Sequence, residues 1–462
     1  MRGIAGTTPL AAPRLLPWRL QPDWPLKVAF LGFPLWWLLG LANVVLLVMT
    51  VPMAMTLWRR RGTLVAPSGF GIWLFFLVWV ALGVLVLWAD APLAEPGGGF
   101  SRLLVYGWRF AWYVSFTVVL LYIGNLSERE LPSGRIGRLL GIMFVVTTAG
   151  GLIGSFFPSI QLTSPVEMML PKGLAQNPFV RDIVHPKVAD MESILGFEQP
   201  RPMAPFAYAN TWGAAYAFFL PYFLLTWIVR AGTWRRMAAF GILAASLWPV
   251  VYSLNRGLWA ALGMMGLFWV VKLLQVGGPR VIAWTAGMAA VGAIIVALSP
   301  LPGLVQDRME NPHSNNRRTM LAEETTRSAL TGSPLVGFGS TRKVQGDLGQ
   351  VAGGAKVGCK ACESPPLGTQ GHLWLLIFAN GVVGTIAFCA FFTLRFFRHW
   401  RERGAYSVAG CAVLIACGLF MLTYDMVEVP LYTVMIAVAL MWRASRDARG
   451  VPTPRPAAGT PL

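Results

Sequence analysis

The chain has 462 residues and a formal net charge of +18, and 55% of its residues are hydrophobic while only 13% are charged. A soluble globular domain carries about 25% charged residues, so this composition, with a mean hydropathy of +0.58, excludes an ordinary soluble fold. The apolar residues form runs of about 20 residues, the length that crosses a hydrocarbon core of about 30 Å. We therefore predict an all-α integral membrane protein.

About a dozen apolar segments are predicted to be transmembrane helices. They span 26–41, 43–58, 69–89, 103–123, 139–157, 206–229, 237–254, 257–273, 281–299, 373–394, 405–423 and 428–442. The first two leave two alternatives open. Gly40 and Asn43 mark either a tight turn between two short helices or a point within one long tilted helix over 26–58.

Lys and Arg residues predict the orientation, because basic residues accumulate in cytoplasmic loops. If residues 59–61 (Arg-Arg-Arg) lie inside, alternation of the helices places 23 basic residues and five acids on that side, which accounts for the whole net charge of +18. We therefore expect both chain ends in the cytoplasm. We also expect no cleavable signal peptide, because the first 24 residues are basic and Pro-rich and contain no apolar core. The excess of basic over acidic residues then serves membrane insertion, and no nucleic-acid partner is needed to explain it.

The predicted organisation has five parts. They are a cytoplasmic N-terminal segment (1–25), nine helices with a long outer loop at 158–205 (26–299), a large extracytoplasmic loop (300–371), three helices (372–443) and a disordered Pro-rich cytoplasmic tail (444–462). Long irregular loops in a compact protein are usually functional or disordered. We therefore look for chemistry at the outer face.

Cys359 and Cys362 form a C-x-x-C pair in the large outer loop. A local disulfide is favoured in an oxidising exterior. A free or otherwise partnered pair and a metal site are the alternatives, but zinc takes four ligands and only Glu363 and His372 lie near in sequence. We expect no metal site.

Arginines near the outer face are the first candidates for substrate binding. Arg256 lies in a hairpin so short that both flanking helices begin almost at once, and Arg grips phosphate oxygens with two parallel hydrogen bonds. Arg109 lies inside the fourth predicted helix, and ionisable groups at membrane depth usually face a polar cavity. The alternative for both is a side chain that reaches to the interface as an anchor.

The large outer loop supplies the remaining candidates. Arg317 and Arg318 belong to a charged stretch with the spacing of a short amphipathic helix, and Arg342 ends a turn-rich stretch. His372 begins the next predicted helix, and a neutral imidazole beside arginines is suited to general-base catalysis. The alternatives are a solvated helix surface for the arginines and an ordinary polar helix start for the histidine.

Four stretches together resemble the O-antigen ligase and polymerase superfamily of bacterial membrane glycosyltransferases, in the form typical of actinobacteria. They are PFAYANTWG (205–213), SLNRGLW (253–259), SPLVGFGSTR (333–342) and GTQGHLW (368–374), which runs on to NGVVG (380–384). Their order, the large loop before a helix with paired glycines and the helix count agree with that superfamily over roughly 26–442. No single motif is specific, and the combination carries the resemblance.

The resemblance implies a GT-C-like membrane glycosyltransferase with two long extracytoplasmic loops in the bacterial plasma membrane. The donor would be a glycan on a polyprenyl diphosphate such as undecaprenyl diphosphate. The hydroxyl of a glycan or lipid acceptor would attack the anomeric carbon with inversion, without metal or cofactor. Arg256 would hold the diphosphate, Arg317 or Arg318 would match an arginine of the large loop, and preorganised cations would stabilise the leaving group.

The position of the base departs from this superfamily. Its loop-end histidine aligns with Gln370, whereas His372 follows two residues later, and residues at i and i+2 do not share a helix face. Either a turn restores His372 to that position, or a carboxylate such as Glu323 or Glu324 replaces it. We expect Gln370 and Arg342 to contact the donor.

Two other function classes remain as alternatives. A transporter or flippase of a lipid-linked or anionic substrate would hold its charged residues near the bilayer midplane. A non-catalytic scaffold for cell-envelope assembly would explain the displaced histidine. The sequence leaves open the choice between ligase and polymerase, the identity of glycan and acceptor, and the oligomeric state.

Overall fold

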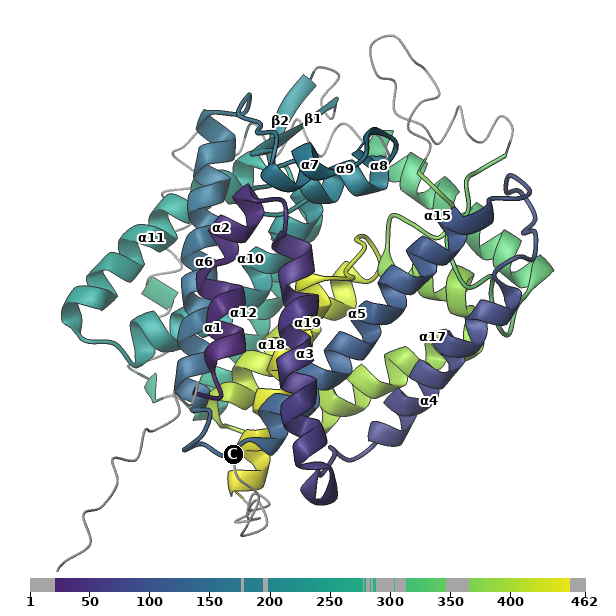
Figure 1. Cartoon of the computed structure of the whole chain (residues 1–462). Coiled ribbons are helices and arrows are strands. Elements are labelled where there is room, and N and C mark those ends of the chain that lie inside the picture. Colours follow the sequence, from purple (N-terminus) through teal and green to yellow (C-terminus); the bar gives the residue numbers. More distant parts are fainter. Residues whose placement is uncertain are drawn as a thin grey trace, which may run out of the picture.

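The computed structural model describes residues 21–448 apart from 176–177, 194–197, 277, most of 280–312 and 346–364. It is mostly helical (72%), and its helices lie side by side in a bundle, with additional short elements at one end (Figure 1). The helices are α1 (Trp24–Leu31), α2 (Phe33–Leu38), α3 (Ala42–Arg59), α4 (Phe70–Leu82), α5 (Gly99–Asn125), α6 (Ser133–Phe156), α7 (Pro165–Met169), α8 (Lys172–Ala175), α9 (Pro178–Val184), α10 (Ala209–Phe223), α11 (Thr233–Tyr252), α12 (Arg256–Val276), α15 (His313–Gly332), α17 (His372–His399), α18 (Ala405–Phe420) and α19 (Val429–Ala448).

Six helices in the described part of the chain are long and apolar enough to cross a membrane. They are α3, α5, α6, α10 with its continuation to Val229, α12 and α17. Each predicted apolar segment except 281–299 coincides with described helical structure, whereas 281–299 lies outside the described residues. The count of twelve spans stays a prediction.

The start of the bundle decides between the two alternatives left open by the sequence. α1, α2 and α3 are separate helices, and Gly40 turns the chain between the last two with a φ of +79°. Glycine adopts this left-handed conformation at no steric cost. A single long helix over 26–58 is therefore wrong, and the tight turn is confirmed.

Two elements differ from the predicted organisation. The loop at 158–205 contains a two-stranded antiparallel hairpin of β1 (Ala189–Ser193) and β2 (Glu198–Pro202), which pair with Ala189 opposite Pro202. Alternating apolar residues were too few in this segment to predict strands. α19 also continues to Ala448, past the predicted end of the last helix at 442.

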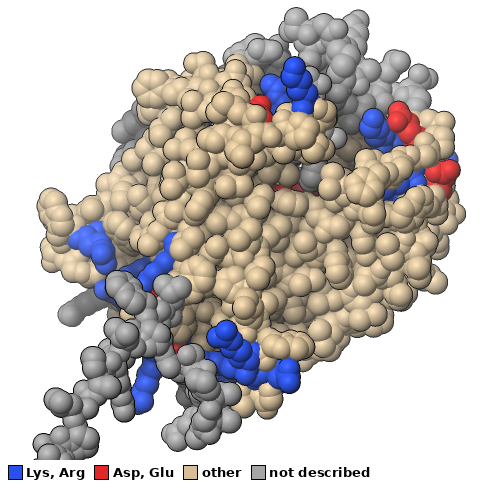
Figure 2. Space-filling view, in the orientation of Figure 1, with Lys and Arg blue, Asp and Glu red and all other residues tan. Residues whose placement is uncertain are grey.

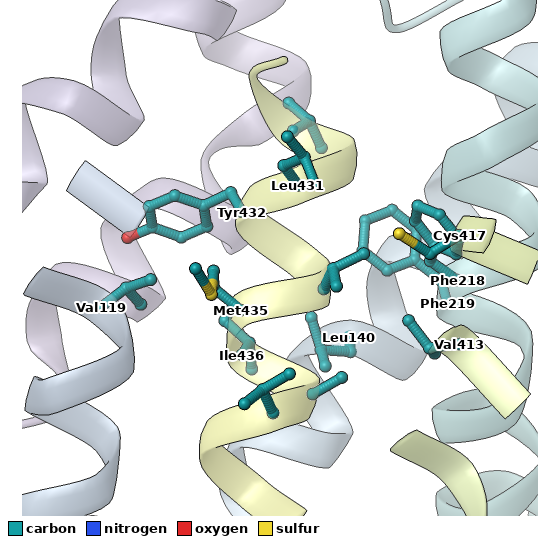
Figure 3. Close-up of a cluster of buried hydrophobic side chains, with 14 of the residues drawn as sticks. Val119, Leu140, Phe218, Phe219, Val413, Cys417, Leu431, Tyr432, Met435 and Ile436 are labelled. Carbon is teal, nitrogen blue, oxygen red and sulfur yellow. The ribbon is translucent and has the colours of Figure 1, made fainter. Parts of the chain in front are cut away.

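α19 lies at the centre of the bundle, with α5 on one side and α10 and α18 on the other (Figure 3). Leu431, Tyr432, Met435 and Ile436 are fully buried, as expected for a helix that is apolar all round. A Cβ atom on Gly124 of α5 would lie 1.9 Å from the ring of Trp442. The small residue therefore lets α5 and α19 approach closely, as small residues do between membrane helices.

The two ends of the bundle differ in charge. Lys and Arg side chains gather at the end where the C-terminus lies, and basic and acidic side chains mix at the opposite end (Figure 2). We call these the basic end and the loop end. At the basic end Arg135 pairs with Asp23, and Arg443 lies 3.1 Å from Glu128. The N-terminal end of the described chain is therefore joined to the start of α6, and the C-terminal end to the connection between α5 and α6.

Arg443 is fully buried at the basic end. Its guanidinium donates to the carbonyls of Ile123 (3.2 Å) and Leu126 (3.3 Å) and to the hydroxyl of Ser133. A cation at a helix C-terminus satisfies carbonyls that have no partner within the helix. Arg443 therefore caps α5 and ties it to α6 and α19.

Replacing Arg443 with Met is expected to lower the free energy of unfolding by about 3 kcal/mol, because it leaves buried carbonyls and a carboxylate without their partner. Arg59 is exposed, so Arg59→Met is the matched control and should change stability little. Thermal unfolding of both variants in one detergent measures the difference. Equal melting temperatures for the two variants would remove this role of Arg443.

α17 is broken near its first third. Gly381 has φ +63° and ψ −173° within the helix, and the segment 333–342 bonds to the backbone at this break. The N–H groups of Phe338 and Gly339 donate to the carbonyls of Phe378 and Ala379, and the N–H of Val382 donates to the carbonyl of Pro334, each at 2.8 Å. The loop is thus fixed into the bundle by backbone hydrogen bonds.

Candidate functional site

The stretches that carry the family resemblance meet in space. The 333–342 segment bonds to the break in α17, which contains the NGVVG stretch. Gly213 of the first stretch faces Asn255 of the second so closely that a Cβ would lie 2.5 Å from Asn255 Nδ2. Segments distant in sequence therefore form one structure at the loop end.

The hairpin between α11 and α12 is held from several sides. Asn255 Oδ1 accepts the N–H of Leu258 (2.9 Å) and caps α12, and Trp259 Nε1 donates to the carbonyl of Val250 (2.9 Å). Arg201 of β2 is buried and donates to the carbonyl of Ser253 at 3.2 Å. These contacts fix the backbone that carries Arg256.

The turn between α18 and α19 joins this hairpin to the start of α17. The hydroxyl of Tyr424 donates to Asn255 Oδ1, and the guanidinium of Arg318 lies over the Tyr424 ring at 5.8 Å. The backbone N–H of His372 donates to the carbonyl of Tyr424 at 2.8 Å. Tyr424 therefore brings α12, α15 and α17 to one place.

Asp425 is the point on which two of the predicted arginines converge. Its carboxylate accepts the backbone N–H of Gly371 at 3.3 Å. Burial raises the pKa of Asp425, while Arg109, Arg318 and two backbone N–H groups act in the opposite direction. Arg109 on α5 and Arg318 on α15 are far apart in sequence, and both guanidinium groups act on this one carboxylate.

Arg109 lies ten residues into α5, which at 1.5 Å per residue is about 15 Å from the helix start. Its Nη2 donates to Thr341 Oγ1 at 3.3 Å. Its Nη1 is buried and makes no hydrogen bond within the described residues. The 333–342 segment therefore reaches the depth of a cation whose hydrogen bonds are incomplete.

Acidic groups line the same region. Glu428 Oε1 accepts the indole N–H of Trp108 at 3.1 Å, and burial raises the pKa of Glu428 to about 7 against the effect of that bond. The hydroxyl of Tyr208 donates to Asp182 at 3.0 Å. Burial raises the pKa of Tyr208, and the charges of Asp182, Glu428 and Asp425 raise it further.

These side chains face a cleft. Tyr208 keeps 43% of its surface accessible and Asp425 is exposed, although enclosure by protein is the main cause of both pKa shifts. A side chain that is enclosed and yet accessible must line a cleft. Figure 2 shows a hollow at the loop end with acidic atoms inside it. We call the group of Asp182, Tyr208, Asp425 and Glu428 the carboxylate cleft, because all three carboxylates act on the pKa of Tyr208.

Other predicted site residues take different positions. His372 is fully buried, its ring packs on Phe388 with centroids 5.1 Å apart, and neither ring nitrogen has a hydrogen-bond partner within the described residues. Arg342 is buried and donates to the carbonyls of Leu87 (2.7 Å) and Phe338 (2.9 Å), among others. Arg342 therefore holds the backbone of the loop, and the ring of His372 is enclosed within the protein.

Four further predictions concern Gln370, Arg317, the Cys359–Cys362 pair and Glu323. Gln370 precedes α17 with φ +65°, and its backbone N–H bonds to Asp425. Arg317 belongs to α15, but its side chain lies outside the described residues, as do Cys359 and Cys362. The exposed Glu323 side chain makes none of the described contacts with the cleft.

Asp425 and Glu428 were missed by sequence reasoning. Both belong to the short connection 421–428 between two apolar helices on the predicted outer side. Two acids in so short an outer connection were a usable signal, since cytoplasmic Arg and Lys dominate the other short loops. Among the described residues no group of three or more His, Cys, Asp or Glu could hold a metal ion.

Comparison of the sequence with protein-family models gives no match, and comparison with curated proteins gives none either.

Proposed function

We propose that this chain is a membrane glycosyltransferase of the O-antigen ligase and polymerase type. It transfers a glycan from a polyprenyl diphosphate to an acceptor hydroxyl at the outer face of the bacterial plasma membrane. The observation that supports this function best is that Arg109 and Arg318 both act on Asp425 at the loop end. Tyr424, the residue before Asp425, donates to Asn255 in the hairpin that carries Arg256.

The arginine arrangement suits a diphosphate. The guanidinium groups of Arg109 and Arg318 lie within electrostatic range of one anion, the carboxylate of Asp425, and the same region suits a second and larger anion. The buried Nη1 of Arg109 has no partner within the described residues, and an unsatisfied buried donor costs about 1–3 kcal/mol. A phosphate oxygen would satisfy it with a charge-assisted hydrogen bond.

The same cations serve the chemistry. When the anomeric C–O bond breaks, the lipid diphosphate gains negative charge, and fixed cations in an enclosed site stabilise that charge without having to reorganise. The arginines supply this charge in the proposed mechanism, which assigns no step to a metal or a cofactor. Arg256 and Arg318 hold the diphosphate, and Arg109 reaches the bridging and leaving oxygens from below.

The proposed orientation places the loop end outside and both chain ends in the cytoplasm. It is supported by the gathering of Lys and Arg at the basic end (Figure 2), because basic loops remain on the cytoplasmic side. The six long apolar helices then span the bilayer. The carboxylate cleft opens toward the outer leaflet, where a polyprenyl lipid presents its diphosphate.

The test follows release of polyprenyl diphosphate from a lipid-linked oligosaccharide by the purified protein in nanodiscs, with a crude envelope extract as acceptor and with EDTA. Arg318→Gln is expected to slow release by about 10- to 100-fold, because it removes one charge-assisted contact. Arg327 lies on the same helix with its side chain 72% exposed, so Arg327→Gln is the matched control and should keep the wild-type rate.

Two outcomes would contradict the proposal. If the wild-type protein never consumes the lipid with any acceptor extract, the enzyme is excluded and transport of the intact lipid between vesicle leaflets becomes the measurement to make. If Arg318→Gln and Arg327→Gln turn over equally, Arg318 does not hold the diphosphate.

A further inference from the structure

Glu428 stands in a strained part of the backbone. Four described residues other than glycine have a positive φ, namely Leu93, Leu254, Gln370 and Glu428 (φ +82°). The last three border the candidate site, since Leu254 precedes Asn255 and Gln370 bonds to Asp425. Residues held in this region cost about 1–3 kcal/mol each and cluster at functional sites. The backbone conformation that orients the Glu428 side chain therefore costs free energy.

The Glu428 carboxylate is held in place from one side. Trp108 Nε1 donates to Oε1 at 3.1 Å, and no other hydrogen bond to this carboxylate is seen in the described part of the chain. Trp108 is adjacent to Arg109 on α5, so the same helix presents the partner of Glu428 and the deepest cation of the site. A carboxylate with one fixed oxygen has a second oxygen available for a ligand.

Tyr208 and Asp182 supply polar and aromatic groups near Glu428. Tyr208 is 43% accessible, its hydroxyl bonds to Asp182 at 3.0 Å, and it lies within electrostatic range of Glu428 and Asp425. Asp182 also lines a small pocket with Asn43 and Ala207. Aromatic faces with a few convergent polar groups are typical of sites for polar small ligands.

We propose that Glu428 is the general base of the transfer reaction and that Trp108, Tyr208 and Asp182 bind the acceptor sugar. This inference rests on the proposed function. The acceptor O–H gives its proton to Glu428 while its oxygen forms the new bond to the anomeric carbon. The bond from that carbon to the diphosphate oxygen breaks, and the electron pair leaves with the lipid diphosphate. Glu428 then releases the proton to water.

Glu428 is better placed for this role than His372. A base must lie within hydrogen-bond reach of the proton that it takes, and the ring of His372 is fully enclosed against Phe388. Glu428 is partly accessible in the cleft that also contains Asp425. The charges of Arg109 and Arg318 act on the pKa of Asp425, whereas the pKa of Glu428 responds to burial and to the Trp108 hydrogen bond.

The pH dependence gives a readout that a structural role would not change. A base works only when deprotonated, and the pKa of Glu428 is raised to about 7 by burial, so kcat/KM should fall as the pH drops below about 7. Tyr208 lies within electrostatic range of Glu428, and Asp182 and Asp425 act on the same tyrosine. The charge of Arg109 acts on Asp425. Tyr208 is neutral throughout, because its own pKa is raised above its ordinary value.

Two variants test the assignment. Glu428→Gln is expected to slow transfer about 100-fold, the lower range for loss of a general base, while binding of polyprenyl diphosphate alone stays within about twofold of wild type. Trp108→Phe removes the bond that lowers the pKa of Glu428, so the acidic limb of the pH profile should move to higher pH. Glu95 is exposed in an outer connection, and Glu95→Gln is the matched control.

The outcomes separate this inference from the proposed function. If wild type transfers glycan and Glu428→Gln does so equally with an unchanged pH profile, Glu428 is not the base although the enzyme stands. If Glu428→Gln loses diphosphate binding or melts at a lower temperature, its role is structural and the inference is overturned. If the acidic limb is unchanged in Trp108→Phe, another group titrates in that limb.

Discussion

Replacing Arg109 with Gln is expected to slow glycan transfer by up to about 1000-fold, which is the range seen when a preorganised donor to a developing negative charge is removed. Arg109 lies deepest of the site cations, and its Nη1 has no hydrogen-bond partner within the described residues. Its contact with Thr341 ties it to the large outer loop. The loss should fall mainly on kcat, because the leaving group carries most charge in the transition state.

The measurement is single-turnover release of polyprenyl diphosphate by purified Arg109→Gln protein. Lys343→Gln is the control, since Lys343 is exposed in the same loop and should leave the rate unchanged. Thr341→Val separates positioning from charge and is expected to have a much smaller effect. A rate for Arg109→Gln within threefold of wild type, in protein with an unchanged melting temperature, would exclude Arg109 from the chemistry.

Replacing Gly381 with Ala is expected to destabilise the protein by about 3–5 kcal/mol and to release the 333–342 segment from α17. The new Cβ would lie 2.2 Å from the carbonyl oxygen of Leu335 and 2.4 Å from its carbon. Backbone atoms cannot move aside as a flexible side chain can, and the residue also has φ +63°. Overpacking and strain therefore add at one position.

Gly418→Ala is the matched control, because a Cβ at Gly418 meets nothing within 4 Å and alanine favours the helix. Thermal unfolding in detergent and limited proteolysis after Arg342 compare the two variants. Gly381→Ala should melt at a lower temperature and be cut faster at the loop end. Equal melting and equal cleavage would show that the break in α17 does not require glycine.

The helices could be predicted from sequence because a chain in lipid must satisfy its backbone hydrogen bonds within each segment, and long apolar runs record that requirement. The four stretches that meet at the loop end could likewise be selected by residue type. The role of each polar residue could not be predicted from the sequence. Arg318 and Arg342 belong to the same predicted loop. Arg318 lies over the Tyr424 ring in the site, whereas Arg342 donates to backbone carbonyls.

Asp425 and Glu428 are site residues that the sequence alone did not identify. They became candidates only through α5 and α15. Arg109 and Arg318 act on Asp425, and Trp108 donates to Glu428, each across more than a hundred residues of sequence. His372 shows the converse, since its type and its place beside the loop favoured catalysis but the packing of Phe388 encloses it. Which side chains share a cleft depends on helix packing, and the linear pattern does not record it.

Arg443 carries two properties that are usually held by different residues. Its charge belongs to the basic set that is predicted to direct insertion, and its guanidinium caps α5 in the folded protein. Lysine would keep the first property, since insertion responds to charge, but a compact ammonium lacks the planar fork that reaches several acceptors. Exposed Arg59 should accept lysine freely, whereas at Arg443 the same exchange should give a correctly inserted protein that unfolds more readily. Topology and stability can therefore be separated in this chain by one conservative substitution.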